Sequence, residues 1–187
     1  LQKTFSLMRE TLFGAHGYGL NSLGTQESVE ALAADDLRAF HAQLAVPNNA
    51  VIAVFGDMDS AQVRADLETV FGLWKRGGDY QVPKLSAGTQ GKRRVADQKD
   101  KEQAVAVLGF HGCTFFDEDR FALELLGEAC SDLGSRLFMR IREELGLAYY
   151  VGAQSQPGMT PGYFSFYAGT SPEQLAQVEA ELMAEAM

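Results

Sequence analysis

A helical pattern that stops at a glycine and continues at once as a strand pattern, over residues 135–150, constrains the fold most strongly. Leu137, Ile141 and Leu145 recur at the spacing of one helix face, and Gly146 suits the left-handed conformation that closes many helices. Beyond the glycine, side chains alternate with the two-residue period of a strand. The pattern therefore predicts a helix joined directly to a strand.

The same junction carries two polar side chains. Arg142 lies in the last turn of the predicted helix, and Tyr149 follows seven positions later at the start of the predicted strand. A guanidinium is a permanent cation with several fixed donors, and a phenol can donate a hydrogen bond to a developing negative charge. We therefore expect both side chains to face one groove. Tyr150, the next residue, is expected to point to the opposite face and to serve packing only.

The composition is that of a globular protein. The 187 residues are 46% apolar and 22% charged, which argues against global disorder. A formal charge of −9 argues against a nucleic-acid partner, since phosphate backbones are bound by a surplus of Lys and Arg. No apolar run approaches the ~20 residues that span a bilayer, so we expect no membrane span. We expect a soluble protein of the cytoplasm or the periplasm, and the sequence does not distinguish the two.

The predicted elements fall into two groups, residues 1–75 and 104–187, separated by a linker over residues 76–103 that is rich in Gly, Pro, Ser, Lys and Arg. In the second group, two strand patterns follow each other closely enough to form a hairpin. We therefore expect an α+β fold, with helices packed on one face of a mainly antiparallel sheet. The predicted helices cover residues 3–13, a short stretch up to 32, 35–44, 60–71, 119–130, 134–145 and 171 onward, and the predicted strands cover residues 50–55, 104–110, 147–154 and 162–169.

The first group contains one convincing strand. Residues 50–55 are a continuous apolar run closed by Gly56 and Asp57, which predicts a strand buried on both faces. Ser60 is expected to cap the helix that follows. A single strand is too little for a closed layer, and the first residue is not Met. We therefore expect the chain to begin inside a domain.

Several ordered blocks of the chain resemble the pitrilysin/insulinase family of zinc metallopeptidases. The resemblance covers essentially the whole chain: residues 1–75 resemble the end of one family domain, and residues 104–187 resemble the start of the next, non-zinc domain. It implies tandem α+β domains that close around unfolded peptides. The blocks are Leu23–Val29, Asp36–His41, Val46–Val51, Val54–Asp59, Ser135–Phe138 and Arg142–Tyr149.

The zinc domain of this family carries an inverted H-x-x-E-H motif, in which two His bind the metal and the Glu activates water. The motif is absent from this sequence, and His16, His41 and His111 are isolated from one another. The resemblance therefore implies zinc in the intact enzyme, with no metal bound by this chain. It also implies that this chain alone is inactive, because its metal ligands lie elsewhere.

The resemblance assigns roles to two residues at the junction. Tyr149 is implied to be catalytic, with its hydroxyl donating toward the oxyanion of the substrate, and Arg142 is implied to bind substrate by holding a backbone carbonyl. The implied substrate is an unfolded peptide or a small protein. The implied partners are the remaining domains or a zinc-bearing partner subunit.

One departure from the family leaves its placement open. The usual His-Pro-Tyr before the Gly-Thr block reads His16-Gly17-Tyr18 here. The piece therefore follows a zinc motif, or belongs to the metal-free second half of a long four-domain chain, and the relaxed motif favours the second placement.

A second function stays open as well, because the same scaffold can lose its chemistry and persist as a non-catalytic structural or assembly subunit. An H-x-x-E-H motif in the parent chain or in a partner chain would favour the peptidase.

Overall fold

The structure is a computed structural model that describes residues 1–15, 17–81 and 91–186. The chain divides into two compact units: the first combines Leu1–Leu23 with Leu85–Met187, and the second is Gly24–Lys84. No helix in the described part of the chain is long and apolar enough to cross a membrane.

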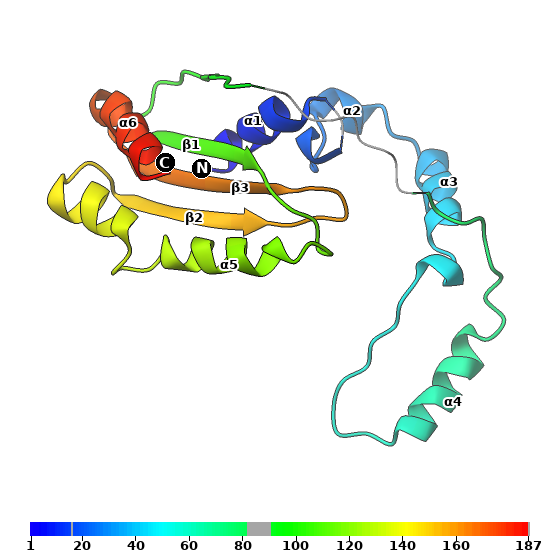
Figure 1. Ribbon diagram of the computed structural model, residues 1–187. Helices are drawn as coiled ribbons and strands as arrows, with labels where there is room; N and C mark the ends of the chain where they lie inside the picture. The colour runs from blue at the N-terminus through cyan, green and yellow to red at the C-terminus, as the bar shows by residue number, and fades with distance from the viewer. Residues whose placement is uncertain (16, 82–90, 187) are drawn as a thin grey trace. The chain divides into compact units, whose positions relative to one another are not determined.

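The first unit is built on a three-stranded antiparallel sheet (Figure 1). Its strands are β1 (Ala104–His111), β2 (Tyr150–Gln156) and β3 (Tyr163–Thr170), and β3 lies in the middle. Phe166 of β3 stands opposite Leu108 of β1 and Ala153 of β2. The predicted hairpin is confirmed, although β2 begins at Tyr150 instead of residue 147.

Helices cover both faces of this sheet. The first unit contains α1 (Gln2–Phe13), α5 (Asp119–Ala129), the helical segment η3 (Phe138–Glu144), α6 (Leu175–Glu185) and the short turns η1 (Gly17–Gly19) and η4 (Pro172–Gln174). The α+β class predicted from the sequence is confirmed. The sequence analysis expected helices on one face of the sheet only, whereas α1 covers the other face. The apolar residues of α1 form a cluster of their own, opposite to the main core.

The buried apolar residues form two clusters, one on each face of the sheet, because neighbouring residues of one strand point to opposite faces. The main core joins alternate residues of the strands to the inner sides of η3 and α6; its members are Ala106, Leu137, Ile141, Leu147, Ala148, Ala153, Phe164, Phe166, Ala168, Val178 and Leu182. The smaller cluster joins Met8 and Phe13 of α1 to Tyr163 of β3. Gly109 allows α1 to approach, since a Cβ there would lie 2.4 Å from the Met8 sulfur.

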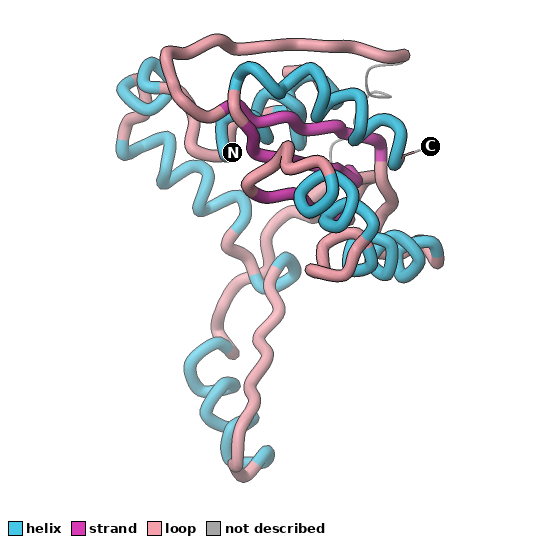
Figure 2. Tube along the Cα trace, turned by 90° about the vertical axis from the view of Figure 1, so that its left-hand side faces the viewer, coloured by secondary structure: helices cyan, strands magenta, loops and turns pink. Residues whose placement is uncertain are grey.

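The second unit contains helices and loops, whereas the strands of Figure 2 all belong to the sheet of the first unit. Its elements are α2 (Gln26–Glu30), α3 (Ala34–Leu44), the turn η2 (Pro47–Asn49) and α4 (Ser60–Phe71). Thr25 caps α2 by accepting a hydrogen bond from the Ser28 N–H. Among the described residues of this unit, Val46 alone is buried.

Two expectations for the second unit are wrong. Residues 50–55 are not a buried strand: Val51 is 95% exposed and Phe55 is 90% exposed, and the segment has no strand beside it among the described residues. An apolar run becomes a strand only when a neighbouring strand takes up its backbone hydrogen bonds. The cap of α4 is Asp59, not Ser60, because the Asp59 carboxylate accepts from the N–H groups of Ala61 and Gln62.

The predicted linker over residues 76–103 has neither helix nor strand in the part that the structure describes, residues 76–81 and 91–103. Arg94 in this stretch reaches α6, where its guanidinium lies 3.1 Å from the Glu179 carboxylate. The predicted domain limits on either side, 1–75 and 104–187, stay a prediction.

Candidate functional site

The candidate site lies where η3 ends and β2 begins. Gly146 has a φ of 61°, the left-handed conformation expected for it. The Leu145 N–H donates to the Arg140 carbonyl at 3.1 Å, and the Leu147 N–H donates to the Ile141 carbonyl at 2.9 Å. Both bonds span more residues than in an α-helix, so the helix closes in a wide final turn.

The central strand β3 anchors this junction from inside. The hydroxyl of Thr170, which is fully buried, donates to the Leu147 carbonyl at 2.5 Å. One residue earlier on β3, the Gly169 carbonyl accepts from the Tyr149 N–H at 2.8 Å. The backbone that carries Tyr149 is therefore held on both sides of Ala148. The sequence analysis missed Thr170, because its partner lies 23 residues away along the chain and no local pattern joins them.

The two side chains predicted for the site are both accessible. Tyr149 is 60% exposed, and the exposed guanidinium of Arg142 lies over the Phe138 ring, 5.0 Å from its centroid. Such cation–π contact orients a guanidinium while leaving its N–H donors available. Within the described residues, Arg142 forms no ion pair. The junction therefore presents an unpaired cation and an exposed phenol.

The other two arginines of this helix form ion pairs. Arg136 lies 2.9 Å from Glu185, and Arg140 lies 3.1 Å from Glu144 and 3.3 Å from Glu181. The hydrogen bond that the Arg140 guanidinium donates to Glu144, together with the charge of Glu181, raises the pKa of Arg140. These pairs attach the helix to α6. Arg136 and Arg140 are four residues apart, as are their partners Glu181 and Glu185. This matched spacing could have shown from the sequence that these two arginines form ion pairs and that Arg142 does not.

Tyr150 lies in a packed environment, as expected for a packing residue. Its ring centroid is 6.4 Å from that of Tyr167, whose ring in turn meets Phe5 of α1 edge to face at 5.7 Å. Burial, and to a smaller degree the neighbouring Tyr167, raises the pKa of the Tyr150 hydroxyl. Tyr150 therefore packs beside Tyr167, and Tyr167 in turn contacts α1.

The donor set of the described residues does not fit a zinc ion. No group of three or more His, Cys, Asp or Glu in this part of the chain could hold a metal. His41 is exposed on α3, and the ring of His111 meets Phe13 edge to face at 5.6 Å. His16 lies outside the described residues. No chemical step of this chain is therefore assigned to a metal of its own.

Comparison with known proteins gives consistent results. The family model described as "Peptidase M16 inactive domain" matches residues 31–187. An uncharacterized zinc protease of Streptomyces coelicolor is 34% identical over 180 residues, which cover 92% of this chain and 39% of that protein. The chain thus spans about two fifths of the length of this curated relative.

Solved structures share the fold. The crystal structure of a peptidase M16 inactive domain from Pseudomonas fluorescens matches with a TM-score of 0.85 and 25% identity, covering 98% of this chain and 46% of that one. A chain in the structure of Complex III2 from Candida albicans matches with a TM-score of 0.73 and 20% identity, over 91% of this chain and 42% of that one. At that identity the second match concerns the fold alone.

Proposed function

The chain belongs to the peptidase M16 inactive-domain family of zinc proteases, and we propose that it supplies the substrate-binding and oxyanion-stabilising side of a zinc peptidase. The pitrilysin/insulinase resemblance is confirmed by this membership. One observation carries the finer proposal: an unpaired guanidinium, Arg142, and an exposed phenol, Tyr149, flank one glycine-ended junction.

The chemistry follows from the donors present. In this proposal the Tyr149 hydroxyl donates to the substrate carbonyl oxygen as negative charge develops on it, and Arg142 holds a second backbone carbonyl of the peptide. Two hydrogen bonds support the proposal, one from the Thr170 hydroxyl to the Leu147 carbonyl and one from the Tyr149 N–H to the Gly169 carbonyl. They hold the backbone that carries Tyr149, and a donor is effective only when it is fixed before the reaction. Zinc would be held by residues outside this chain, in a remaining domain or a partner subunit.

Substitution in the intact enzyme tests both roles. We expect Tyr149→Phe to lower kcat by about 10²-fold, as loss of one oxyanion donor does. Arg142→Met should mainly raise KM, since it removes a contact made to bound substrate. The matched control is Tyr150→Phe, which loses a hydroxyl from a packed ring and should leave turnover near that of the wild type. An unchanged kcat in Tyr149→Phe would remove Tyr149 from the mechanism.

The second candidate function is a non-catalytic assembly subunit. Its support is that the same fold occurs in a chain of Complex III2. Under this alternative, a parent or partner chain would carry no H-x-x-E-H motif, and a chelator would leave any activity of the assembly unchanged. This chain alone is proposed to be inactive under both functions.

A further inference from the structure

The side chain of Arg140 joins the last turn of η3 to a second helix. Its Nη1 donates to the Glu144 carboxylate at 3.1 Å, and its Nε donates to the Glu181 carboxylate at 3.3 Å. Glu144 is the last residue of η3, whereas Glu181 lies on α6. We call these three residues the Arg140 clamp. The clamp connects the end of η3 to α6 through one guanidinium.

The α6 side of the clamp is fixed in the core of the first unit. Val178 and Leu182, which lie three residues before and one residue after Glu181, are fully buried. The side chain of Glu181 is 23% exposed and that of Arg140 is 44% exposed, so solvent reaches the ion pair only in part. A packed helix moves little, and α6 therefore gives the clamp a stable support.

The turn that the clamp closes is wider than an α-helical turn. The Leu145 N–H donates to the Arg140 carbonyl and the Gly146 N–H donates to the Arg142 carbonyl, each at 3.1 Å. The first of these bonds joins residues five positions apart, and such wide turns are rare and are frequently found at functional sites. Arg140 therefore holds this turn twice, through its carbonyl and through its ion pair with Glu144.

Arg142 lies two residues after Arg140 and depends on the same turn. Its guanidinium lies over the Phe138 ring of the same helix, 5.0 Å from the centroid. Within the described residues, no hydrogen bond or ion pair joins the Arg142 side chain to an element outside η3. Tyr149 differs, because its N–H donates to the Gly169 carbonyl of β3 at 2.8 Å. The two site residues thus have separate anchors, α6 for Arg142 and β3 for Tyr149.

We propose that Arg140 is a positioning residue, which places Arg142 for substrate binding through its contacts with Glu144 and Glu181. The inference rests on the function proposed for Arg142, and it adds that different elements support binding and chemistry. A lysine would not replace Arg140, since one ammonium is a point charge without the rigid fork that holds two carboxylates in place. Exposed ion pairs add little to stability, so the clamp acts on geometry more than on the melting temperature.

Steady-state kinetics of the intact enzyme test this division of roles. We expect Arg140→Gln to raise KM about 5- to 10-fold, because Arg142 is then poorly placed for bound substrate. It should leave kcat within about 2-fold of the wild type, because Tyr149 keeps its anchor on β3. A loss of folded enzyme would instead lower the apparent kcat with KM unchanged. An unchanged KM in Arg140→Gln would overturn the proposal.

A double-mutant cycle tests whether Arg140 acts through α6. Glu181→Gln should also raise KM, because it removes the α6 side of the clamp. The double variant, with Arg140→Gln and Glu181→Gln, should raise KM no more than Arg140→Gln alone, since both substitutions remove the same contact. Independent effects that multiply in the double variant would overturn the proposal.

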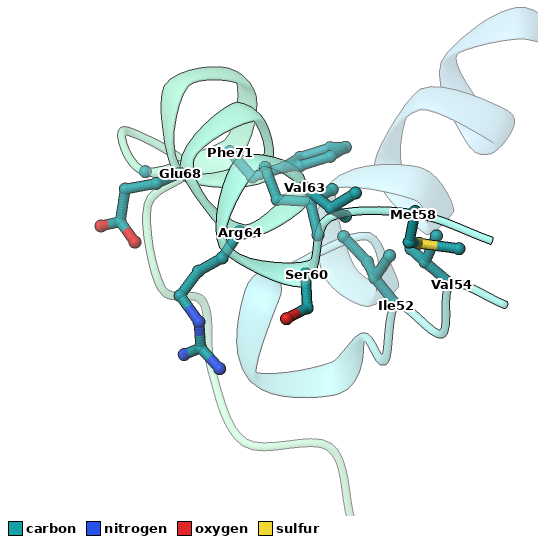
Figure 3. A pocket seen from close by; sticks show the side chains of 10 residues that line it. Ile52, Val54, Met58, Ser60, Val63, Arg64, Glu68 and Phe71 are labelled. Carbon is teal, nitrogen blue, oxygen red and sulfur yellow. The ribbon is translucent and has the colours of Figure 1, made fainter. Parts of the chain in front are cut away.

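Two other arginines provide matched controls. Arg94→Gln removes an ion pair with Glu179 on the same helix α6, at 3.1 Å, and leaves η3 untouched. Arg64 on α4 precedes Glu68 by four residues, as Arg140 precedes Glu144, but within the described residues the two form no ion pair and their side chains extend apart (Figure 3). Both Arg94→Gln and Arg64→Gln should leave KM within about 2-fold of the wild type. A rise in either equal to that of Arg140→Gln would overturn the proposal.

Amide hydrogen exchange of the intact enzyme gives a readout that does not depend on activity. In Arg140→Gln, the Leu145 and Gly146 amides should exchange about 10-fold faster, because their turn has lost its support. The Tyr149 amide should exchange as in the wild type, because its bond to Gly169 is unaffected. Equal acceleration at all three amides, or at none, would overturn the proposal.

The outcomes separate this inference from the proposed function. If Arg142→Met raises KM and Arg140→Gln does not, Arg142 keeps its role and only the clamp is wrong. If neither substitution raises KM, the role of Arg142 in substrate binding is wrong, and the positioning role of Arg140 fails with it.

Discussion

β1 and the segment Val51–Phe55 differ in what lies beside them. β1 pairs along its whole length with β3 and is covered by α1 on one face and by α6 on the other. Val51–Phe55 has α4 near one face and no strand at either edge within the described residues. Both are runs of apolar residues. The comparison teaches that the partner, not the run itself, decides whether an apolar segment becomes a strand.

β2 shows a third arrangement, in which a side chain closes an outer edge. The Ser131 hydroxyl donates to the Ala153 carbonyl at 2.7 Å and accepts from the Ala153 N–H at 3.0 Å. One hydroxyl thus satisfies both backbone groups that would otherwise face outward. Native proteins protect edge strands from unwanted pairing in such ways. Val51–Phe55 has no comparable protection among the described residues.

The largest expected effect is a difference in the free energy of unfolding between a substitution in the packed core and one in the segment Val51–Phe55. Ile141 is fully buried in the core of the first unit, and Ile141→Ala should lower the free energy of unfolding by about 2–5 kcal/mol. Ile52→Ala removes the same atoms from a half-exposed side chain and should lower it by less than about 1 kcal/mol. Denaturant titration followed by circular dichroism measures both. Equal losses would show that the second unit is packed as well as the first.

A smaller effect is expected at the anchor of the candidate site. Thr170→Val leaves the Leu147 carbonyl buried without its donor, and should lower the free energy of unfolding by about 1–3 kcal/mol. The matched control is Thr69→Val on α4, where an exposed hydroxyl donates to the Ala65 carbonyl at 2.9 Å and water can replace it. The same titration compares the two variants. A Thr170→Val loss no larger than that of Thr69→Val would mean that the junction does not depend on this bond.

The smallest effect concerns the closed edge of β2. Ser131→Ala should lower the free energy of unfolding by about 0.5–1.5 kcal/mol, speed exchange of the Ala153 amide and increase self-association, because the edge is then open. Hydrogen exchange and sedimentation measure the last two changes. Ser131→Thr keeps the hydroxyl and is the control. An Ala153 amide that stays equally protected in Ser131→Ala would show that the hydroxyl does not close the edge.

Local patterns predicted the elements whose signals lie within a few residues. Gly146 was placed in its left-handed turn because the helical period ends beside it, and the β2–β3 hairpin followed from two strand patterns in succession. The α+β class follows from the same patterns. The family blocks added the roles proposed for Arg142 and Tyr149, which stay predictions.

The features that the sequence analysis missed depend on distant partners. Thr170 bonds to Leu147 and Ser131 bonds to Ala153, both across more than 20 residues, and no local period marks either pair. The strand expected at residues 50–55 failed for the same physical reason. Its apolar pattern is local, whereas the hydrogen bonds that make a strand come from elsewhere in the sheet.

The amide of Asn48 has a consequence for how this scaffold can be altered. Because it joins the chain before residue 50 to the chain after residue 76, the stretch between them enters and leaves at one point. Such a stretch can be exchanged for a short turn, or for a helix of another length, with little loop-closure penalty for the residues that remain. Asn48 thus allows the stretch between residues 50 and 76 to be replaced as one segment, while the junction that carries Arg142 and Tyr149 stays unaltered.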